Sequence, residues 1–429
     1  MREMKDSGVK WIGEIPAQWE VRKIASVVPV VTDFVASGSF ADLRDNVKYL
    51  DTPDYAMLVR TADLSGTRDN TVYIDKHAYE YLSNSNLFGG EIILSNIGSV
   101  GNVFQYTPMY ERSSLAPNAI MLNGTECNRY LYYWFLNPIA NDELKRIGSH
   151  AVQLKFNKTQ LKQMAIVYPP IEDQQKIAAR LDRKCTQIDA LISNAQQQIE
   201  KLKAYKQSVI TETVTKGLDP DVQMKDSGVE WIGEIPEHWT VAPIRSFFKI
   251  KKDIIGHEPD TVLSITQGGI KVKDINENSG QMANSYAHYQ IVNIGDFAMN
   301  HMDLLTGGVG ISEFEGVTSP DYRVFVMRNA DMNPRYFLYV FQMYYRNKIF
   351  YAFGQGAANL GRWRLPAQNF NTVAVPLSPV EEQNSIVTFL DEKCTQIDKL
   401  IALKQQKIEK LQQYKKSMIY EYVTGKKEV

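Results

Sequence analysis

The chain repeats itself in two places, and this repeat constrains the fold more than any other feature. Met4–Val21 reads MKDSGVKWIGEIPAQWEV, and Met224–Val241, 220 residues later, matches it at 14 of 18 positions. A second pair, Glu172–Lys216 and Glu381–Gly425, lies 209 residues apart and shares the hexapeptide KCTQID. Chance does not produce two such matches, so the 429 residues hold two tandem copies of one unit.

The stretches between these repeats have diverged. Residues 22–168 and 242–377 share only short landmarks, such as Gly90-Glu91 before an apolar run, which returns as Gly295-Asp296. Each unit is therefore a nearly constant opening, a divergent domain and a nearly constant helix. Two copies that keep one scaffold and change the domain between its parts are expected to meet different surfaces.

The second repeat predicts two long helices with a heptad seam. Proline-containing entrances precede both, Gly217 and Gly425 are natural stops, and about 45 residues of helix span about 65–70 Å. Seam positions alternate steps of three and four residues, as coiled coils do. They are Leu181, Cys185, Ile188, Ile192, Ile199 and Leu202 in the first helix, and Leu390, Cys394, Ile397, Ile401, Ile408 and Leu411 in the second.

Two helices with matching seams in one chain most simply pair with each other. An antiparallel pair spares the second domain from returning the chain over the full helix length, so we expect antiparallel pairing and a pseudo-two-fold relation between the domains. A generic dimerisation coiled coil is the alternative. The predicted class is α+β, with domains 1–168 and 218–378 and spacer helices 169–217 and 379–425, because short β-rich runs precede one or two helices in each domain.

Charge is uneven inside the divergent domains. The whole chain is nearly neutral, with 48 basic and 49 acidic residues, and so gives no support for a nucleic-acid partner. The last third of each domain is nevertheless basic, and arginine, lysine, asparagine and glutamine are the groups that hold phosphates and read base edges. The candidate DNA-binding residues are Lys145, Arg146, Gln153, Lys155, Asn157 and Lys158 in the first domain, and Arg323, Gln355, Asn359, Arg362 and Arg364 in the second.

Motifs of catalysis and metal binding are absent from the sequence. The three cysteines are far apart, and neither a phosphate loop nor HExxH occurs, so we expect no catalytic residue, no metal site and no cofactor held by this chain. The free cysteines, the missing signal peptide and the absence of an 18-residue apolar run predict a cytoplasmic protein without a membrane span.

The duplicated signatures resemble the specificity subunit of type I restriction-modification systems. The resemblance rests on MKDSGVxWIGEIPxxW, on KGLDP at Lys216–Pro220, and on the helix entrances at Pro170 and Pro379, each followed by acid and glutamine. It implies two target-recognition domains that each read half of a bipartite DNA site, with the helices as a ruler. It also implies partners: double-stranded DNA, two modification subunits that carry S-adenosylmethionine and methylate adenine, and a restriction subunit that carries ATP and magnesium.

Two other classes remain as alternatives. One is a duplicated coiled-coil adaptor that binds proteins rather than DNA, and such a protein shows no DNA affinity even beside a methyltransferase. The other is a nuclease, whose activity would disappear on substitution of a single acid while binding survives.

The basic segment before the second spacer helix provides a first test. We expect Arg362→Ala combined with Arg364→Ala to weaken DNA binding and to make its salt dependence shallower, because each phosphate contact contributes to the slope. Titration of a DNA duplex at several salt concentrations measures both quantities. An unchanged slope removes this segment from the DNA contacts.

Overall fold

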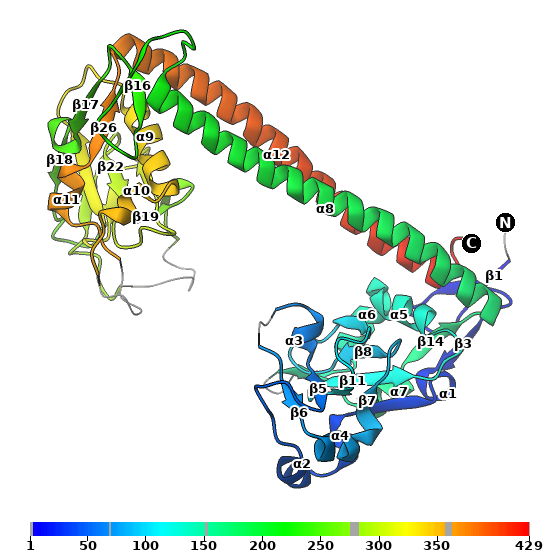
Figure 1. Cartoon of the computed structure of the whole chain (residues 1–429). Helices are drawn as coiled ribbons and strands as arrows, with labels where there is room; N and C mark the ends of the chain where they lie inside the picture. Colours follow the sequence, from blue (N-terminus) through cyan, green and yellow to red (C-terminus); the bar gives the residue numbers. More distant parts are fainter. Residues whose placement is uncertain (1–2, 68–69, 151–152, 275–282, 357–362, 429) are drawn as a thin grey trace. The chain divides into compact units, whose positions relative to one another are not determined.

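The computed structural model describes residues 3–67, 70–150, 153–274, 283–356 and 363–428. It divides into two compact units, Met1–Gln196 with Gln405–Val429, and Gln197–Lys404 (Figure 1). Each unit combines one divergent domain with parts of both long helices. Strands and helices alternate in both, which confirms the α+β class.

The first divergent domain is built on two four-stranded sheets. Its core sheet has the order β4-β11-β8-β9, with all neighbours antiparallel: Val30–Asp33, Ala119–Asn123, Ile92–Ser95 and Val103–Gln105. The second sheet has the order β6-β5-β10-β7: Tyr73–Ile74, Ala56–Val59, Ser113–Leu115 and Asn86–Leu87. Its helices are α1 (Ile24–Val27), α2 (Phe40–Asn46), α3 (Thr61–Leu64), α4 (Lys76–Tyr81), α5 (Asn128–Leu136), α6 (Pro138–Arg146) and α7 (Lys158–Gln163).

The second divergent domain keeps the core sheet and replaces the other one. The order β18-β25-β22-β23 is the counterpart of the first core sheet: Phe248–Lys251, Arg323–Met327, Phe297–Met299 and Val309–Ile311. In place of the second sheet are two antiparallel pairs. One is the hairpin of β19 (Leu263–Thr266) and β20 (Gly269–Val272), and the other joins β21 (Gln290–Val292) to β24 (Gly316–Thr318), which flank the core strands β22 and β23 in the chain. The helices are α9 (Pro334–Arg346), α10 (Ile349–Ala352) and α11 (Ala367–Thr372).

The acid of the shared landmark holds the turn into the core sheet. Glu91 is buried and accepts the backbone amides of Phe88 and Gly89 at 2.8 Å. Asp296 is buried in the same place, accepts the amide of Asn293 at 2.8 Å and pairs with Lys251 at 2.7 Å. A carboxylate that accepts amide donors satisfies backbone groups which the turn leaves without partners. The landmark therefore has a structural role in both domains.

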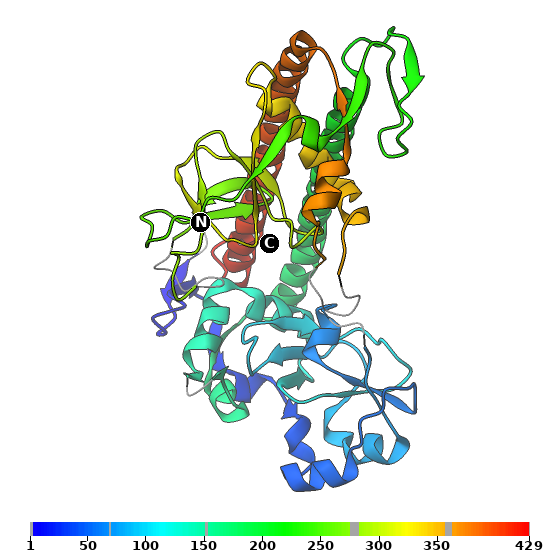
Figure 2. The same ribbon diagram turned by 90° about the vertical axis from the view of Figure 1, so that its left-hand side faces the viewer.

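The long helices are α8 (Ile171–Lys216) and α12 (Val380–Val423), and they pair antiparallel. In the first unit Lys415 Nζ donates to Asp189 at 2.7 Å, and in the second unit Lys206 Nζ donates to Asp398 at 2.7 Å. The partner on α12 thus falls from 415 to 398 as the position on α8 rises from 189 to 206. Within each unit the portions of both helices run side by side in both views (Figure 2).

The predicted seam is the buried side of these helices. Leu181, Cys185 and Ile188 share one buried cluster with Met418 and Ile419. The remaining predicted seam residues are buried or half-buried: Ile192, Ile199, Leu202, Leu390, Cys394, Ile397, Ile401, Ile408 and Leu411. The antiparallel pairing is therefore confirmed, and the predicted seam residues lie on the buried or half-buried side of the helices.

The constant openings dock on the first turns of the long helices. Each opening forms a hairpin: β1-β2 (Met4–Asp6, Glu14–Pro16) in the first copy and β15-β16 (Met224–Asp226, Glu234–Pro236) in the second. The next strand then pairs antiparallel with the strand before the long helix. These pairs are β3 (Glu20–Lys23) with β14 (Ala165–Tyr168), and β17 (Thr240–Pro243) with β26 (Ala374–Leu377). Trp19 Nε1 donates to Asp173 at 3.0 Å, and Trp239 Nε1 donates to Glu382 at 2.8 Å. The acid of each helix entrance thus fixes a buried tryptophan.

A buried tyrosine in each unit links the end of one long helix to the strand that precedes the other long helix. Tyr130 on α5 donates to the carbonyl of Val167 at 2.8 Å and lies 3.1 Å from the carbonyl of Val423. Tyr336 on α9 does the same to Pro376 at 3.1 Å and Val214 at 3.4 Å. Burial raises the pKa of both hydroxyls, so they remain protonated donors at neutral pH.

These hydroxyls provide a stability test. We expect Tyr130→Phe and Tyr336→Phe each to lower the free energy of unfolding by about 1–2 kcal/mol, because buried carbonyls lose their donor without a change in packing. Thermal and denaturant unfolding measure the change, with the exposed Tyr49→Phe as the control. Equal stability of all three variants and the parent chain would contradict the role of the hydroxyls.

Candidate nucleic-acid interface

The basic segments around Lys155 in the first domain and Arg364 in the second, called the returning segments, are each joined to their core sheet by the same kind of backbone contact. In the first domain the amide of Phe156 donates to the carbonyl of Asn96 at 3.1 Å, and in the second the amide of Leu365 donates to the carbonyl of His301 at 2.9 Å. Asn96 directly follows the end of β8, and His301 lies two residues after the end of the equivalent strand, β22. Lys155 and Arg364, one residue earlier, therefore occupy equivalent places.

Lys155 and Arg364 are the predicted residues best placed to meet a ligand. Both side chains are exposed, and neither has an ion-pair partner within the described residues. The backbone of Lys155 is held in a short pair, β12 (Ser149–His150) with β13 (Leu154–Lys155). Arg364 exchanges two backbone hydrogen bonds with Gln355, at 2.7 and 3.0 Å, and Gln355 is also exposed.

The other three basic candidates in the first domain have acidic partners. Lys145 lies 3.4 Å from Asp142, and Arg146 lies 2.6 Å from Glu143, both one turn away on α6. Lys158 is half-buried and pairs with Asp33 of β4 at 2.7 Å. These charges are partly neutralised by their own domain, so they add less to an attraction for phosphate than the composition predicts.

The polar candidates Asn157 and Gln153 differ in their local contacts. Asn157 caps α7, and its side-chain oxygen accepts the amide of Gln160 at 2.9 Å. Gln153 is exposed. The candidates Asn359 and Arg362 lie outside the described residues, so their prediction stays a prediction.

Arg323 is a correction to the surface placement that the sequence predicts. Its side chain is only 5% exposed. Nη2 donates to the carbonyl of Leu365 at 2.7 Å, and the guanidinium lies 4.7 Å from the centre of the Phe370 ring. Arg323 opens β25 and points into the domain, because its position in the sheet is a core position. It therefore contacts the returning segment from the core side of the domain and does not face solvent.

Asn96 and His301 escaped the sequence prediction. The Asn96 side chain donates to the carbonyl of Phe156 at 3.1 Å, so it holds the same segment that its backbone holds. His301 is neutral at pH 7, because burial and then the charges of Arg323 and Arg364 lower its pKa to about 3. The sequence signal that could have identified them is their spacing, because each lies five residues after the acid of the Gly-acid pair, Glu91 or Asp296.

Within the part of the chain that the structure describes, no group of three or more His, Cys, Asp and Glu side chains is placed to hold a metal ion. The helices of the described residues include none that is long and apolar enough to cross a membrane.

The family model described as "Type I restriction modification DNA specificity domain" matches the chain twice, over residues 16–201 and 236–413. The chain belongs to this family, and as a specificity subunit it is a non-catalytic member of its type I restriction-modification system. Its two copies of the domain carry the DNA-recognition role of the family.

Relatives extend over nearly the whole chain. The protein named as the MjaX specificity subunit of a type I restriction enzyme from Methanocaldococcus jannaschii is 26% identical and aligns with 97% of this chain and 95% of its own length. The MjaVIII specificity subunit of the same organism is 25% identical over 61% of each chain. A solved chain from a study of assembly and conformational transition of a type I system has a TM-score of 0.67 at 12% identity and covers 96% of this chain and 99% of its own, which shows a shared fold.

Proposed function

We propose that the chain directs a type I complex to an asymmetric bipartite DNA site, with each recognition domain reading one half. The observation that supports this most strongly is the pair of matched segment ends on equivalent core sheets, which present Lys155 in one domain and Arg364 in the other. Exposed cations of this kind hold phosphates, and neighbouring amides such as Gln153 and Gln355 suit base edges. Because the side chains around them differ, the two half-sites differ.

The catalytic groups belong to partner subunits in this proposal. Two modification subunits carry S-adenosylmethionine and methylate adenine, and a restriction subunit carries ATP and magnesium. Co-expression of the chain with its modification subunit, followed by single-molecule mapping of methylated adenines, tests the proposal. A methylated motif of two different halves with an unspecified gap supports it. An assembled complex that binds and methylates no specific sequence favours the adaptor alternative.

The paired helices set the gap between the half-sites. α8 begins in the core of the first unit and ends in the core of the second, and a seam residue recurs every three or four positions between them. A rigid spacer makes half-site distance part of specificity and joins two weak interactions into one stronger interaction.

Insertion of one heptad tests the ruler. Seven residues added within Leu181–Val209 and seven at the facing place within Leu390–Met418 should lengthen the gap by about three base pairs, since seven helical residues rise about 10 Å and a base pair about 3.4 Å. Methylation mapping should recover the same half-site bases. A four-residue insertion in both helices, which breaks the seam phase, is the control expected to destabilise the chain. Altered half-site bases after the heptad insertion would refute the ruler.

Exposed apolar residues beside the seam provide a surface for modification subunits. Leu191 and Tyr414 in the first unit are 47% and 52% exposed, and Tyr205 and Leu400 in the second are 49% and 47% exposed. Leu191 and Leu400 directly precede the seam residues Ile192 and Ile401, and Tyr205 and Tyr414 precede Lys206 and Lys415, which lie four residues after Leu202 and Leu411 and continue the seam. The two sets are related by the 209-residue repeat. Large apolar side chains repeated on an exposed helix flank are typical of a protein interface, and two equivalent sets fit two copies of one partner.

Substitution of one set should remove one modification subunit. We expect Leu191→Lys with Tyr414→Lys to weaken assembly at the first unit by about tenfold or more, because exposed aromatic and aliphatic anchors dominate interface energy. Native mass spectrometry of the co-expressed complex measures the loss, while unfolding of the free chain stays unchanged. Phe40→Lys, at an exposed position of the first domain, is the control. Full occupancy of both sites by the double variant would refute this surface.

A further inference from the structure

Three basic side chains gather where the second domain's core sheet meets the returning segment. They are His301, Arg323 and Arg364, and the segment itself is joined to this end of the sheet by the Leu365 amide and carbonyl. The charges of both arginines act on His301 and, after burial, lower its pKa. Within the described residues the Arg323 guanidinium hydrogen-bonds to the Leu365 carbonyl and pairs with no carboxylate. The cluster therefore carries an excess of positive charge.

The first domain has no buried charge at the corresponding place. Strand register defines the equivalence: Leu94 of β8 faces Ile120 of β11, and Met299 of β22 faces Arg323 of β25. Ile120 is fully buried, as a core-sheet residue should be. The scaffold thus accepts isoleucine at this position, and the guanidinium of Arg323 is an addition that the fold itself does not require.

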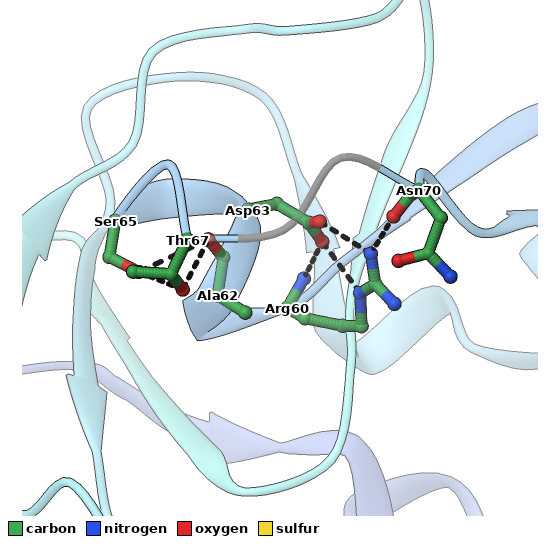
Figure 3. A network of polar contacts seen from close by, with 6 residues as sticks. All are labelled: Arg60, Ala62, Asp63, Ser65, Thr67 and Asn70. Carbon is green, nitrogen blue, oxygen red and sulfur yellow. Dashed lines mark hydrogen bonds and ion pairs between the residues drawn. The ribbon is translucent and has the colours of Figure 1, made fainter. Parts of the chain in front are cut away.

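Arg323 is incompletely paired for a buried cation. Burial lowers its pKa to about 10, so it remains protonated at neutral pH, and Nη1 has no hydrogen-bond partner within the described residues. Arg60 in the first domain shows the usual solution: its guanidinium contacts both carboxylate oxygens of Asp63, at 2.6 and 2.9 Å (Figure 3). A buried charge without such a partner is destabilising unless a ligand supplies the opposite charge.

Arg364 is the exposed member of the cluster, so an anion would approach the cluster from its side. It is exposed, it belongs to the segment that Arg323 holds, and it acts on the same histidine. An anion bound by Arg364 would lie beside the residue, Leu365, whose carbonyl the charged Arg323 holds. In the first domain Lys155 precedes the equivalent residue Phe156, and the apolar Ile120 holds the strand position of Arg323, so any anion there has one cation instead of two.

We propose that Arg364 binds a backbone phosphate of the second half-site and that Arg323 is its positioning residue, which holds Leu365 and strengthens the local positive field from below. This rests on the proposed DNA-recognition function and deepens it. It predicts that the second half-site contributes more salt-dependent affinity through this position than the first half-site contributes through Lys155.

The test uses the complex of the full chain with its modification subunits and a DNA duplex that carries its methylated motif. Arg364→Ala and Arg323→Ile should each weaken binding by about tenfold and make the slope of log affinity against log salt shallower by about one. Arg323→Lys should retain most of the slope, and Arg323→Ile with Arg364→Ala should be no weaker than Arg364→Ala. Lys225→Ala, at an exposed lysine of the second opening, is the control for loss of a charge.

Stability separates this role from a merely structural one. Isoleucine fits the equivalent strand position and removes an incompletely paired buried charge, which offsets the lost donor to the Leu365 carbonyl. The free Arg323→Ile chain should therefore unfold at about the same temperature as the parent, although its complex binds DNA less well. A methylphosphonate at the contacted phosphate should abolish the difference between Arg364→Ala and the parent. Unchanged salt slopes for Arg364→Ala, or a loss of stability without a loss of slope for Arg323→Ile, would overturn the inference. If the parent complex itself shows no sequence-specific binding, the proposed function fails instead.

Discussion

The rest of the structure depends on the antiparallel register of the two long helices. Their seam includes lysines as well as apolar residues, and Lys206 and Lys415 reach Asp398 and Asp189. Half-exposed ion pairs add little free energy. They do discriminate between registers, because a shift by one heptad would leave a lysine in the seam without its aspartate. Polar residues at single seam positions are a known means of fixing the alignment of helices.

This register determines how each unit completes its core. The first unit buries Met418, Tyr422 and Val423 with residues from the start of α8. Its core therefore combines segments that are more than 200 residues apart in the chain, and it can close only when the end of α12 is available. The second unit is continuous in sequence, from Gln197 to Lys404. Contacts of long sequence separation slow folding, so the first unit is expected to be the later one to consolidate.

The sequence predicts the constant parts well, because repetition exposes them. The long helices with their stops at Gly217 and Gly425, and the apolar strand after each Gly-acid pair, agree with the structure. The pairing of the short strands was not predictable, since the choice of partner strand is non-local. This is why the first domain's second sheet, which the second domain lacks, left no recognisable pattern.

The candidate site was predicted only in part for a related reason. Basic composition locates the segment but cannot separate exposed Arg364 from buried Arg323, or show that Lys158 already has Asp33 as a partner. That distinction follows from strand register: a position that alternation assigns to the core face holds Ile120 in one copy and Arg323 in the other. The equivalence of Ile120 and Arg323 becomes apparent only when the strand registers of the two core sheets are compared.

The same geometry explains how the two domains can diverge while the scaffold stays constant. The contacts that return each basic segment to its sheet join backbone to backbone, Phe156 to Asn96 and Leu365 to His301. Backbone contacts impose few requirements on side-chain identity, so the residues beside them can change without loss of the segment's position. The constant tryptophan and acid contacts fix the helices instead. Side chains at the segment ends can therefore vary, while the helices and openings that bear the register remain nearly identical in both copies.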